Sequence, residues 1–345
     1  MQAATLPTMR LLDMDKARLN ILFLAKHACA GGIWSPEDGN HAVYHHEMLC
    51  TLREIGLQVE TANTYAALFE RPQTDFVVTL LNRGGFVNSE MLAPLLATRC
   101  DVPFLGASPI LRGIADDKHA CKLIARCHDV PTMDWVAFRR GGIAPNRILH
   151  ADRLVVKPNA SSASWGIAIV DNWQAALRHV SDLHDTGHDA IVEEWAPLYD
   201  IAVPVIGGRH GAPWILPPMI YRPEDPHHLR NYEEKRGLAG EIDAFDPLEP
   251  VTDPSLTAQL KDLTSRIIPE LWPFDYGRLE FRYDPFSGAI RFMEINISCN
   301  LWSRKTISRS AATLGVDHTT LVETIVAHSL ARQGLISEHS LEFAA

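Results

Sequence analysis

One candidate β-hairpin, at residues 278–296, constrains this chain more than any other segment. Its two arms alternate apolar and polar side chains around a turn of Pro, Phe, Ser and Gly at 285–288. Such alternation on both sides of a turn is typical of two paired antiparallel strands with one polar face. The pattern therefore predicts a hairpin, and its register follows if Asp284 and Ile290 close the loop without a bulge.

This register places two carboxylates face to face, with Glu280 opposite Glu294 and Asn296 opposite Arg278. Directly opposed like charges weaken a sheet, and two close carboxylates resist ionising together. A cation relieves the repulsion, and two carboxylates with an amide oxygen suit Mg²⁺, which often completes its shell with substrate phosphates. The alternative is an exposed hairpin in which Arg278 and Arg282 pair with the glutamates. The segment by itself leaves both interpretations open.

The composition is that of an ordinary globular protein. The chain has 345 residues, of which 46% are hydrophobic and 21% charged, enough for two or three domains. No apolar run approaches a membrane span, and residues 1–20 lack the apolar core of a signal peptide, so we expect a cytoplasmic protein without membrane contact. A net charge of -10 without a Lys/Arg run argues against nucleic-acid binding and favours small-molecule partners. The six cysteines form no CxxC pair and are expected to be reduced.

The first third of the chain alternates predicted strands and helices. Strands are expected at 21–24, 76–81 and 102–106, and helices at 41–56 and 91–98. Strands that alternate with helices indicate a parallel sheet covered on both faces, with ligands reached at the loops that follow the strands. The sequence therefore predicts an α/β domain here.

A β-loop-β unit is predicted at 154–170, with a loop of small residues at 159–164. Such a loop leaves room for backbone N–H groups and for the hydroxyl groups of Ser161 and Ser162 to bind an anion. It is not a Walker P-loop, because Lys157 precedes the loop and GxxxxGK[ST] occurs nowhere. A plain hairpin remains the alternative.

The remaining elements follow from periodicity and from helix start and stop signals. Helices are predicted at 116–127, 256–268, 303–314 and 318–333, strands at 190–195 and 200–206, and irregular loops across 217–254.

These segments together resemble the ATP-grasp superfamily, and most closely its D-alanine–D-alanine ligase branch, from about residue 20 to residue 330. The resemblance is carried by segments in sequence order: 106–109 with Asp117-Lys118, 155–158, 191–195 with Asp200, 232–235, 277–280 and 293–296. It implies an α/β protein of three domains with an ATP-grasp fold. The expected units are an N-terminal parallel-sheet domain at 1–108, a central lobe at 109–192, a C-terminal lobe with the metal site at 193–335, and a tail at 336–345.

The resemblance also implies a nucleotide site between two α+β lobes. Lys118 and Lys157 would contact ATP phosphates, together with the loop hydroxyls already named, and Lys235 would lie beside the nucleotide. The residues implied around adenine are Glu193, Glu194, Trp195 and Ala196, and Asp200 stands where the family usually has a ribose-binding glutamate.

The metal interpretation gains from this resemblance. Glu280, Glu294 and Asn296 would hold two Mg²⁺ ions, or Mn²⁺, that bridge the phosphates. Arg278 would stabilise the oxyanion formed when an acyl phosphate is attacked. The implied reaction is ATP-dependent ligation of a carboxylate to an amine, releasing ADP and phosphate. A homodimer is also implied.

The substrate side departs from the family pattern. The serine and tyrosine of the family's closing network are replaced by Ala163 and Arg236, and no glutamate aligns in the first-domain loop. Arg236, Asn300, Arg304 and Lys305 are the candidate substrate contacts, and the last two suggest an acceptor with extra negative charge. We therefore expect a ligase for amino-acid-like substrates other than two D-alanines. The alternatives are a nucleotide-binding protein without turnover and an ATP-grasp enzyme with a non-amine nucleophile.

Two other interpretations are weaker. The adjacent His45, His46 and Glu47 suggest zinc, but HExxH is absent, and we expect surface or loop residues there. Cys299 follows the hairpin and has no histidine partner suggested by the sequence, so we expect a bystander rather than a nucleophile.

Overall fold

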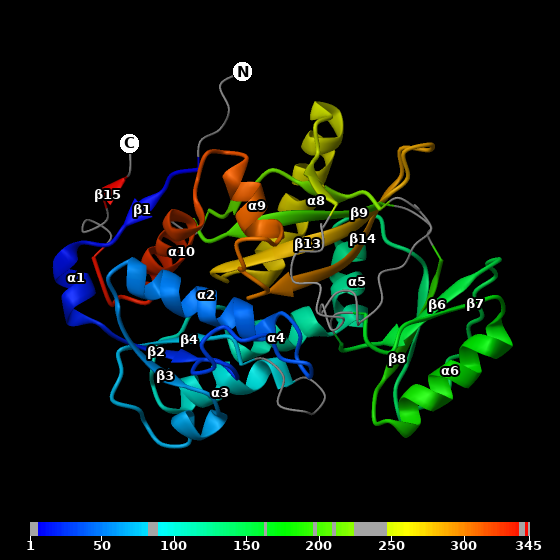
Figure 1. Ribbon diagram of the computed structural model, residues 1–345. Coiled ribbons are helices and arrows are strands. Elements are labelled where there is room, and N and C mark those ends of the chain that lie inside the picture. The colour runs from blue at the N-terminus through cyan, green and yellow to red at the C-terminus, as the bar shows by residue number, and fades with distance from the viewer. Residues whose placement is uncertain are drawn as a thin grey trace.

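The computed structural model describes residues 6–81, 89–161, 164–195, 199–208, 212–223, 247–337 and 342–343. Three larger sheets and a short two-stranded one organise this part of the chain, as Figure 1 shows. Among the described residues, none of the helices has the length and apolar character needed to cross a membrane.

The N-terminal sheet is parallel, as predicted, but one of its strands is not the expected one. Its order is β3-β2-β4, with β2 at Asn20–Leu24, β3 at Gln58–Ala62 and β4 at Phe76–Thr79. The predicted strand at 102–106 contributes only a single bridge, from Phe104 to Val77. Strand β3 escaped prediction because it lies at the sheet edge and carries half-exposed polar side chains.

The helices of this domain agree with the predicted periodicity. Helix α2 spans His41–Glu54 and α3 spans Leu92–Arg99, after the short 3-10 helix η2 at Ser89–Met91. Gly56 follows α2 with φ +98°, a left-handed conformation that ends a helix without strain only at glycine.

The central lobe is a four-stranded antiparallel sheet in the order β5-β8-β6-β7. Its members are β5 (Trp135–Phe138), β6 (Leu154–Pro158), β7 (Ala168–Val170) and β8 (Ala190–Glu194), and helix α6 (Trp173–Asp185) packs on one face. The β-loop-β unit is confirmed, although its second strand begins at Ala168 rather than Trp165.

The largest sheet crosses the middle of the molecule (Figure 1), with the order β12-β11-β9-β13-β14 and with β10 paired to β9. The strands are β9 (Tyr199–Ile206), β10 (Trp214–Ile215), β11 (Met219–Tyr221), β12 (Leu248–Pro250), β13 (Tyr276–Tyr283) and β14 (Ile290–Ile297). Helices α4 (Pro109–Asp116), α5 (Lys118–Cys127) and α8 (Pro254–Leu271) share its hydrophobic core. The expected irregular loop at 217–254 thus contains β11 and β12 in its described parts.

The hairpin of β13 and β14 has the predicted pairing at its functional end and a different one at its turn. Glu280 pairs with Glu294, but Tyr283 pairs with Ile290, so the loop is one residue longer than expected. A β-bulge at Met293 reconciles the two registers. The assumption of a bulge-free loop is therefore wrong, while the opposed glutamates that were derived from it are confirmed.

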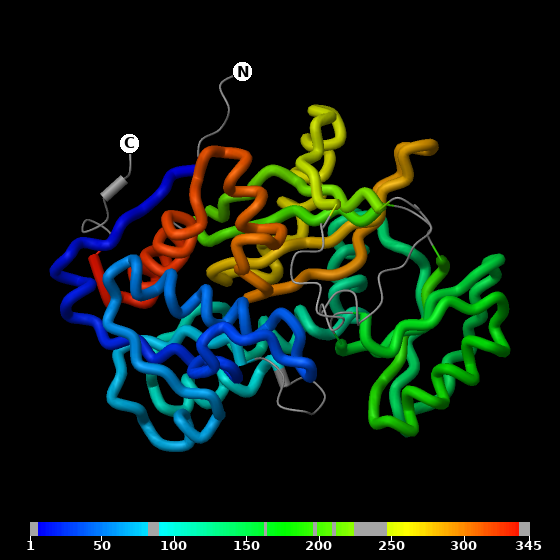
Figure 2. Tube along the Cα trace, in the orientation of Figure 1, coloured from blue at the N-terminus to red at the C-terminus, as the bar shows by residue number. Residues whose placement is uncertain are grey.

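The last helices return to the N-terminal domain. Figure 2 shows α10 (His318–Arg332) beside the first part of the chain, and one hydrophobic cluster contains α10, α9 (Thr306–Ala312), α2 and β2. Strand β1 (Met9–Arg10), just before α1 (Asp13–Arg18), pairs with β15 (Glu342–Phe343) inside the expected tail. The four domain boundaries stay a prediction.

Candidate active site

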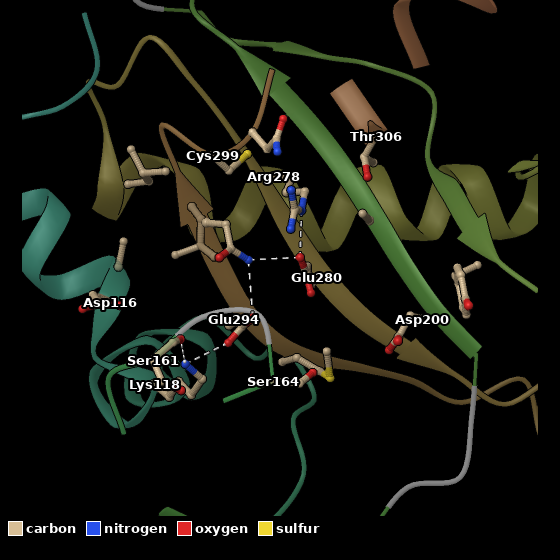
Figure 3. A pocket seen from close by; sticks show the side chains of 18 of the residues that line it. Asp116, Lys118, Ser161, Ser164, Asp200, Arg278, Glu280, Glu294, Cys299 and Thr306 are labelled. Atoms are coloured by element: carbon tan, nitrogen blue, oxygen red, sulfur yellow. Dashed lines mark hydrogen bonds and ion pairs between the residues drawn. The ribbon is translucent and has the colours of Figure 1, made fainter. Parts of the chain in front are cut away.

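A cavity of about 380 Å³ lies between the central lobe, the largest sheet and the N-terminal domain. Helix α2 contributes Tyr44 and His45 to its lining, and the end of β6 with the loop after it contributes Lys157 and Ser161. The polar face of β13 and β14 forms one wall, as Figure 3 shows. Of the predicted site residues that the structure describes, all except Arg304 line this cavity.

The opposed carboxylates share one hydrogen-bonded network in this wall (Figure 3). Arg278 Nε donates to Glu280 Oε1 at 2.7 Å, and Asn296 Nδ2 donates to the same oxygen at 3.0 Å and to Glu294 Oε1 at 3.4 Å. Burial acts to lower the pKa of Arg278, but Glu280, Cys299 and Glu294 together outweigh it and the pKa is raised. The alternative of an exposed hairpin is wrong in that this face lines a cavity, and it is right that Arg278 pairs with Glu280.

Lys118 joins three parts of the site. It is the first residue of α5, whose N-cap Asp117 accepts a hydrogen bond from the Ala120 N–H. Its Nζ donates to the Ser161 carbonyl at 2.9 Å and lies 3.2 Å from Glu294 Oε2. Burial acts to lower the pKa of Lys118, but Glu294, Asp116 and Cys121 together outweigh this effect and the pKa is raised. The ammonium group therefore stays charged between the loop that contains Ser161 and the carboxylate pair.

Lys157 reaches the cavity from the end of β6 and pairs with Glu193 of β8, Nζ to Oε2, at 2.8 Å. The other carboxylate oxygen of Glu193 lies 3.1 Å from Lys122 Nζ, a residue that sequence reasoning missed. Burial acts to raise the pKa of Glu193, but the two lysines outweigh it and the pKa is lowered. Glu193 is 2% exposed and forms ion pairs with both lysines, so its side chain holds the two cations together behind the cavity.

Arg282 is a second cation that sequence reasoning did not place in the site, and it lies beside residues predicted to contact adenine and ribose. Arg282, two residues along β13 from Glu280, lies 3.1 Å from Asp200 Oδ1 and 5.7 Å from the centre of the Trp195 ring. Alternation on β13 directs it to the cavity face. Asp200, Glu194 and Trp195 line the cavity as expected.

The predicted acceptor contacts separate into two groups. Asn300 and Lys305 line the cavity, whereas Arg304 is exposed and lies over the Trp302 ring at 5.7 Å. Glu47 of α2 fixes this segment by accepting hydrogen bonds from Trp302 Nε1 at 2.9 Å and from the Ser303 N–H at 2.8 Å. Sequence reasoning missed this role of Glu47, because its partners lie more than 250 residues away.

Some predictions lie outside the described residues. These are Ser162, Ala196, Lys235 and Arg236 among the site residues, together with the replacement at Ala163.

His45 and Cys299, the remaining candidates, both line the cavity. His45 is buried rather than on the surface, and its Nδ1 accepts the His27 N–H at 3.2 Å. Burial raises the pKa of the Cys299 thiol, although Arg278 opposes the change, which disfavours the thiolate. Within the described ranges, no group of three His, Cys, Asp or Glu side chains is arranged to hold a metal ion.

The architecture and this cavity define an ATP-grasp fold. Solved structures with the same fold include a D-alanine–D-alanine ligase from Bacillus anthracis complexed with ATP, at 18% identity and TM-score 0.68, covering 92% of this chain and 99% of that one. The D-alanyl-alanine synthetase A from Vibrio cholerae has 16% identity and TM-score 0.71, covering 90% and 98%.

The family is defined by sequence. The family model for the D-ala D-ala ligase C-terminus matches residues 124–327, which is more than half of the chain, and the chain belongs to this family. A D-alanine–D-alanine ligase of Desulfovibrio desulfuricans is 26% identical over 309 residues, covering 88% of this chain and 96% of that protein. An uncharacterized protein, y4sG, of Sinorhizobium fredii is 28% identical over 240 residues, covering 68% and 69%.

Proposed function

We propose that this protein is an ATP-dependent carboxylate–amine ligase that forms an amide bond through an acyl phosphate and releases ADP. The observation that carries the proposal is the convergence of Lys118, Lys157, Arg278, Glu280 and Glu294 on one cavity. Family membership supports the same reaction class. A homodimer and a cytoplasmic location belong to this proposal as well.

The carboxylates fit the expected metal. Glu280 and Glu294 present oxygen ligands from adjacent strands, and Asn296 lies between them. Oxygen ligands from one or two carboxylates, completed by phosphate oxygens, are what Mg²⁺ takes in nucleotide sites. Bound there, one or two Mg²⁺ or Mn²⁺ ions would neutralise phosphate charge during transfer.

The side chains around this pair can support two successive bond exchanges. First, a carboxylate oxygen of the donor attacks the γ-phosphorus, and the bond to ADP breaks as Lys118 and Lys157 hold the phosphates. The acceptor nitrogen then attacks the acyl carbon, loses a proton, and expels phosphate. Arg278, held by Glu280 at 2.7 Å, supplies a fixed donor for the oxyanion of the second step.

The substrates we propose are amino-acid-like compounds other than two D-alanines. Support comes from Lys305, which lines the cavity where the family resemblance implies a small hydroxyl residue that binds the acceptor carboxylate. A second cation beside that carboxylate favours an acceptor with an additional anionic group. Arg304 lies over Trp302 and is the weaker candidate for this contact.

The experiment is ADP release measured across a grid of carboxylates and amines, with D-alanine included as both. We expect turnover with an anionic acceptor and little D-alanyl-D-alanine at millimolar substrate. Efficient D-alanyl-D-alanine formation would refute the substrate proposal. Tight ATP binding without ADP release for any pair would favour a nucleotide-binding protein without turnover.

A further inference from the structure

A lysine with no exposed surface lies behind the candidate phosphate site. Lys122 is 0% exposed, and its Nζ contacts Glu193 Oε1 at 3.1 Å and donates to Thr132 Oγ1 at 2.8 Å. Thr132 in turn donates to the Phe292 carbonyl of β14 at 2.7 Å. The Nζ also lies 5.6 Å from the centre of the Trp135 ring. Lys122 does not line the cavity, so it is placed to act through its neighbours.

The charges of this buried group do not cancel. Lys122 and Lys157 contribute two ammonium groups and Glu193 contributes one carboxylate, and all three side chains are at most 8% exposed. A charge that is taken out of water is costly unless it is paired. The excess positive charge therefore favours an anion on the side of the group that is open to the cavity, where Lys157 lies.

The group also joins two hydrophobic cores. Lys122 extends from α5, which packs in the core of the largest sheet, while Glu193 and Lys157 belong to the central sheet. A fixed Glu193 leaves Lys157 little freedom, because the carboxylate holds its ammonium at 2.8 Å.

We propose that Lys122 is a positioning residue for nucleotide binding: it fixes Glu193, and through Glu193 it fixes Lys157, and it supplies the excess charge that a nucleotide phosphate neutralises. This inference rests on the proposed function, because it takes ATP as the ligand.

The titration of Lys122 offers a readout that a purely structural role would not move. Burial lowers the pKa of Lys122 to about 8, while Glu193 of β8 opposes this effect, Lys157 of β6 adds to it, and Glu294 of β14 opposes it. A bound phosphate favours the charged lysine. ATP affinity should therefore fall as the pH rises through 8, by about tenfold between pH 7 and pH 9 for one linked proton.

The test is calorimetric titration of the full-length protein with ATP and Mg²⁺ at pH 7 and pH 9. In Lys122→Met we expect ATP affinity at pH 7 to be lower by about tenfold or more, the equivalent of one pKa unit of interaction, and the pH dependence to be lost. The fold should survive, because Glu193 keeps Lys157 as its partner and an apolar side chain of similar size replaces a buried cation.

Arg126→Met is the matched control. Arg126 lies on the same helix, stacks on the same Trp135 ring at 4.1 Å and pairs with Asp134, but it has no part in the buried group. The affinity of the Arg126→Met variant for ATP, and the pH dependence of that affinity, should match those of the wild type.

Two outcomes would overturn the inference, and a third would refute the proposed function instead. Unchanged affinity and pH dependence in Lys122→Met would show that the lysine is only structural. If that variant does not fold, the wild type decides the matter: ATP binding at pH 8.5, measured in two buffers of different ionisation enthalpy, must take up protons, and no uptake refutes the role of Lys122. A wild type that fails to bind ATP at all would instead refute the proposed function on which the inference rests.

Discussion

Neutralising either of the opposed carboxylates should remove metal-dependent turnover without unfolding the protein. In the native protein, Arg278 and Asn296 donate hydrogen bonds to Glu280 Oε1 at 2.7 and 3.0 Å. Glu280→Gln keeps the size of the side chain and leaves a carbonyl oxygen that can accept one of these hydrogen bonds. A charge-assisted hydrogen bond contributes about 1.5 to 3 kcal/mol. Because Glu280 is 20% exposed, solvent screening should keep the loss of folding stability near the lower figure.

The catalytic cost should be larger than the folding cost. Removal of one preorganised group that stabilises charge in the transition state raises the activation free energy by about 2.7 to 4 kcal/mol, which lowers the rate 10²- to 10³-fold. Glu294→Gln should cost at least as much, since it also removes the partner of Lys118 at 3.2 Å. Glu249→Gln, an exposed glutamate on β12 of the same sheet, is the control and should behave as wild type.

Two measurements test this prediction. Mn²⁺ binding in the presence of ATP, followed by electron paramagnetic resonance, reports the metal site directly, and ADP release reports turnover once a substrate pair is known. Thermal unfolding checks the fold. Near-normal metal binding and turnover in both Gln variants would show that these carboxylates hold no metal.

Three further predictions concern the nucleotide, the acceptor and the fold. Lys157→Met should weaken ATP binding by about tenfold or more, since a charged hydrogen bond contributes roughly 1.5 to 3 kcal/mol, and unchanged affinity by calorimetry would refute the phosphate contact. Lys305→Ala should raise the acceptor KM far more than the ATP KM, and Arg304→Ala should raise it less; equal, small effects would place both cations outside the site. Asp275→Asn should lower the free energy of unfolding in urea by about 1.5 to 3 kcal/mol, the contribution of a charged hydrogen bond, because it removes the carboxylate that pairs with the partly exposed Arg332 at 2.9 Å; a loss below 1 kcal/mol would contradict this reasoning.

The elements that sequence patterns predicted are those whose buried side chains form a recognisable pattern, either a continuous apolar run or a regular alternation. The parallel strands at 20–24 and 76–79 are short apolar runs, and the opposed glutamates follow from alternation along two long strands. Strand β3 carries no such pattern, because an edge strand buries little of its surface.

The missed site residues depend on contacts between distant segments. Lys122 follows Lys118 by one helical turn, a spacing that puts both side chains on one face of α5. This spacing was the signal in the sequence that could have indicated Lys122 as a site residue. Its partner Glu193 lies on another sheet, and a single sequence does not reveal such a pairing. Glu47 is similar, since Trp302 and Ser303 approach it only after α2 has packed against the C-terminal segment.

The sequence of β14 contains a signal for the bulge, namely a change in which positions are apolar. The buried apolar positions of β14 are Ile290 and Phe292 before the bulge and Ile295 and Ile297 after it, so the buried side chains change from even to odd positions at Met293. One extra residue explains this change of parity.

The same bulge adds one residue to β14 beyond what regular alternation requires. Each half of β14 is held by its own pair of buried side chains, and Met293 is the extra residue between the two halves. Without Met293, Phe292 and Glu294 would be adjacent, and simple alternation would still direct the first to the core and the second to the cavity. The bulge is therefore not what keeps the glutamates opposed, and its consequence is that two successive side chains of β14, Met293 and Glu294, both line the cavity.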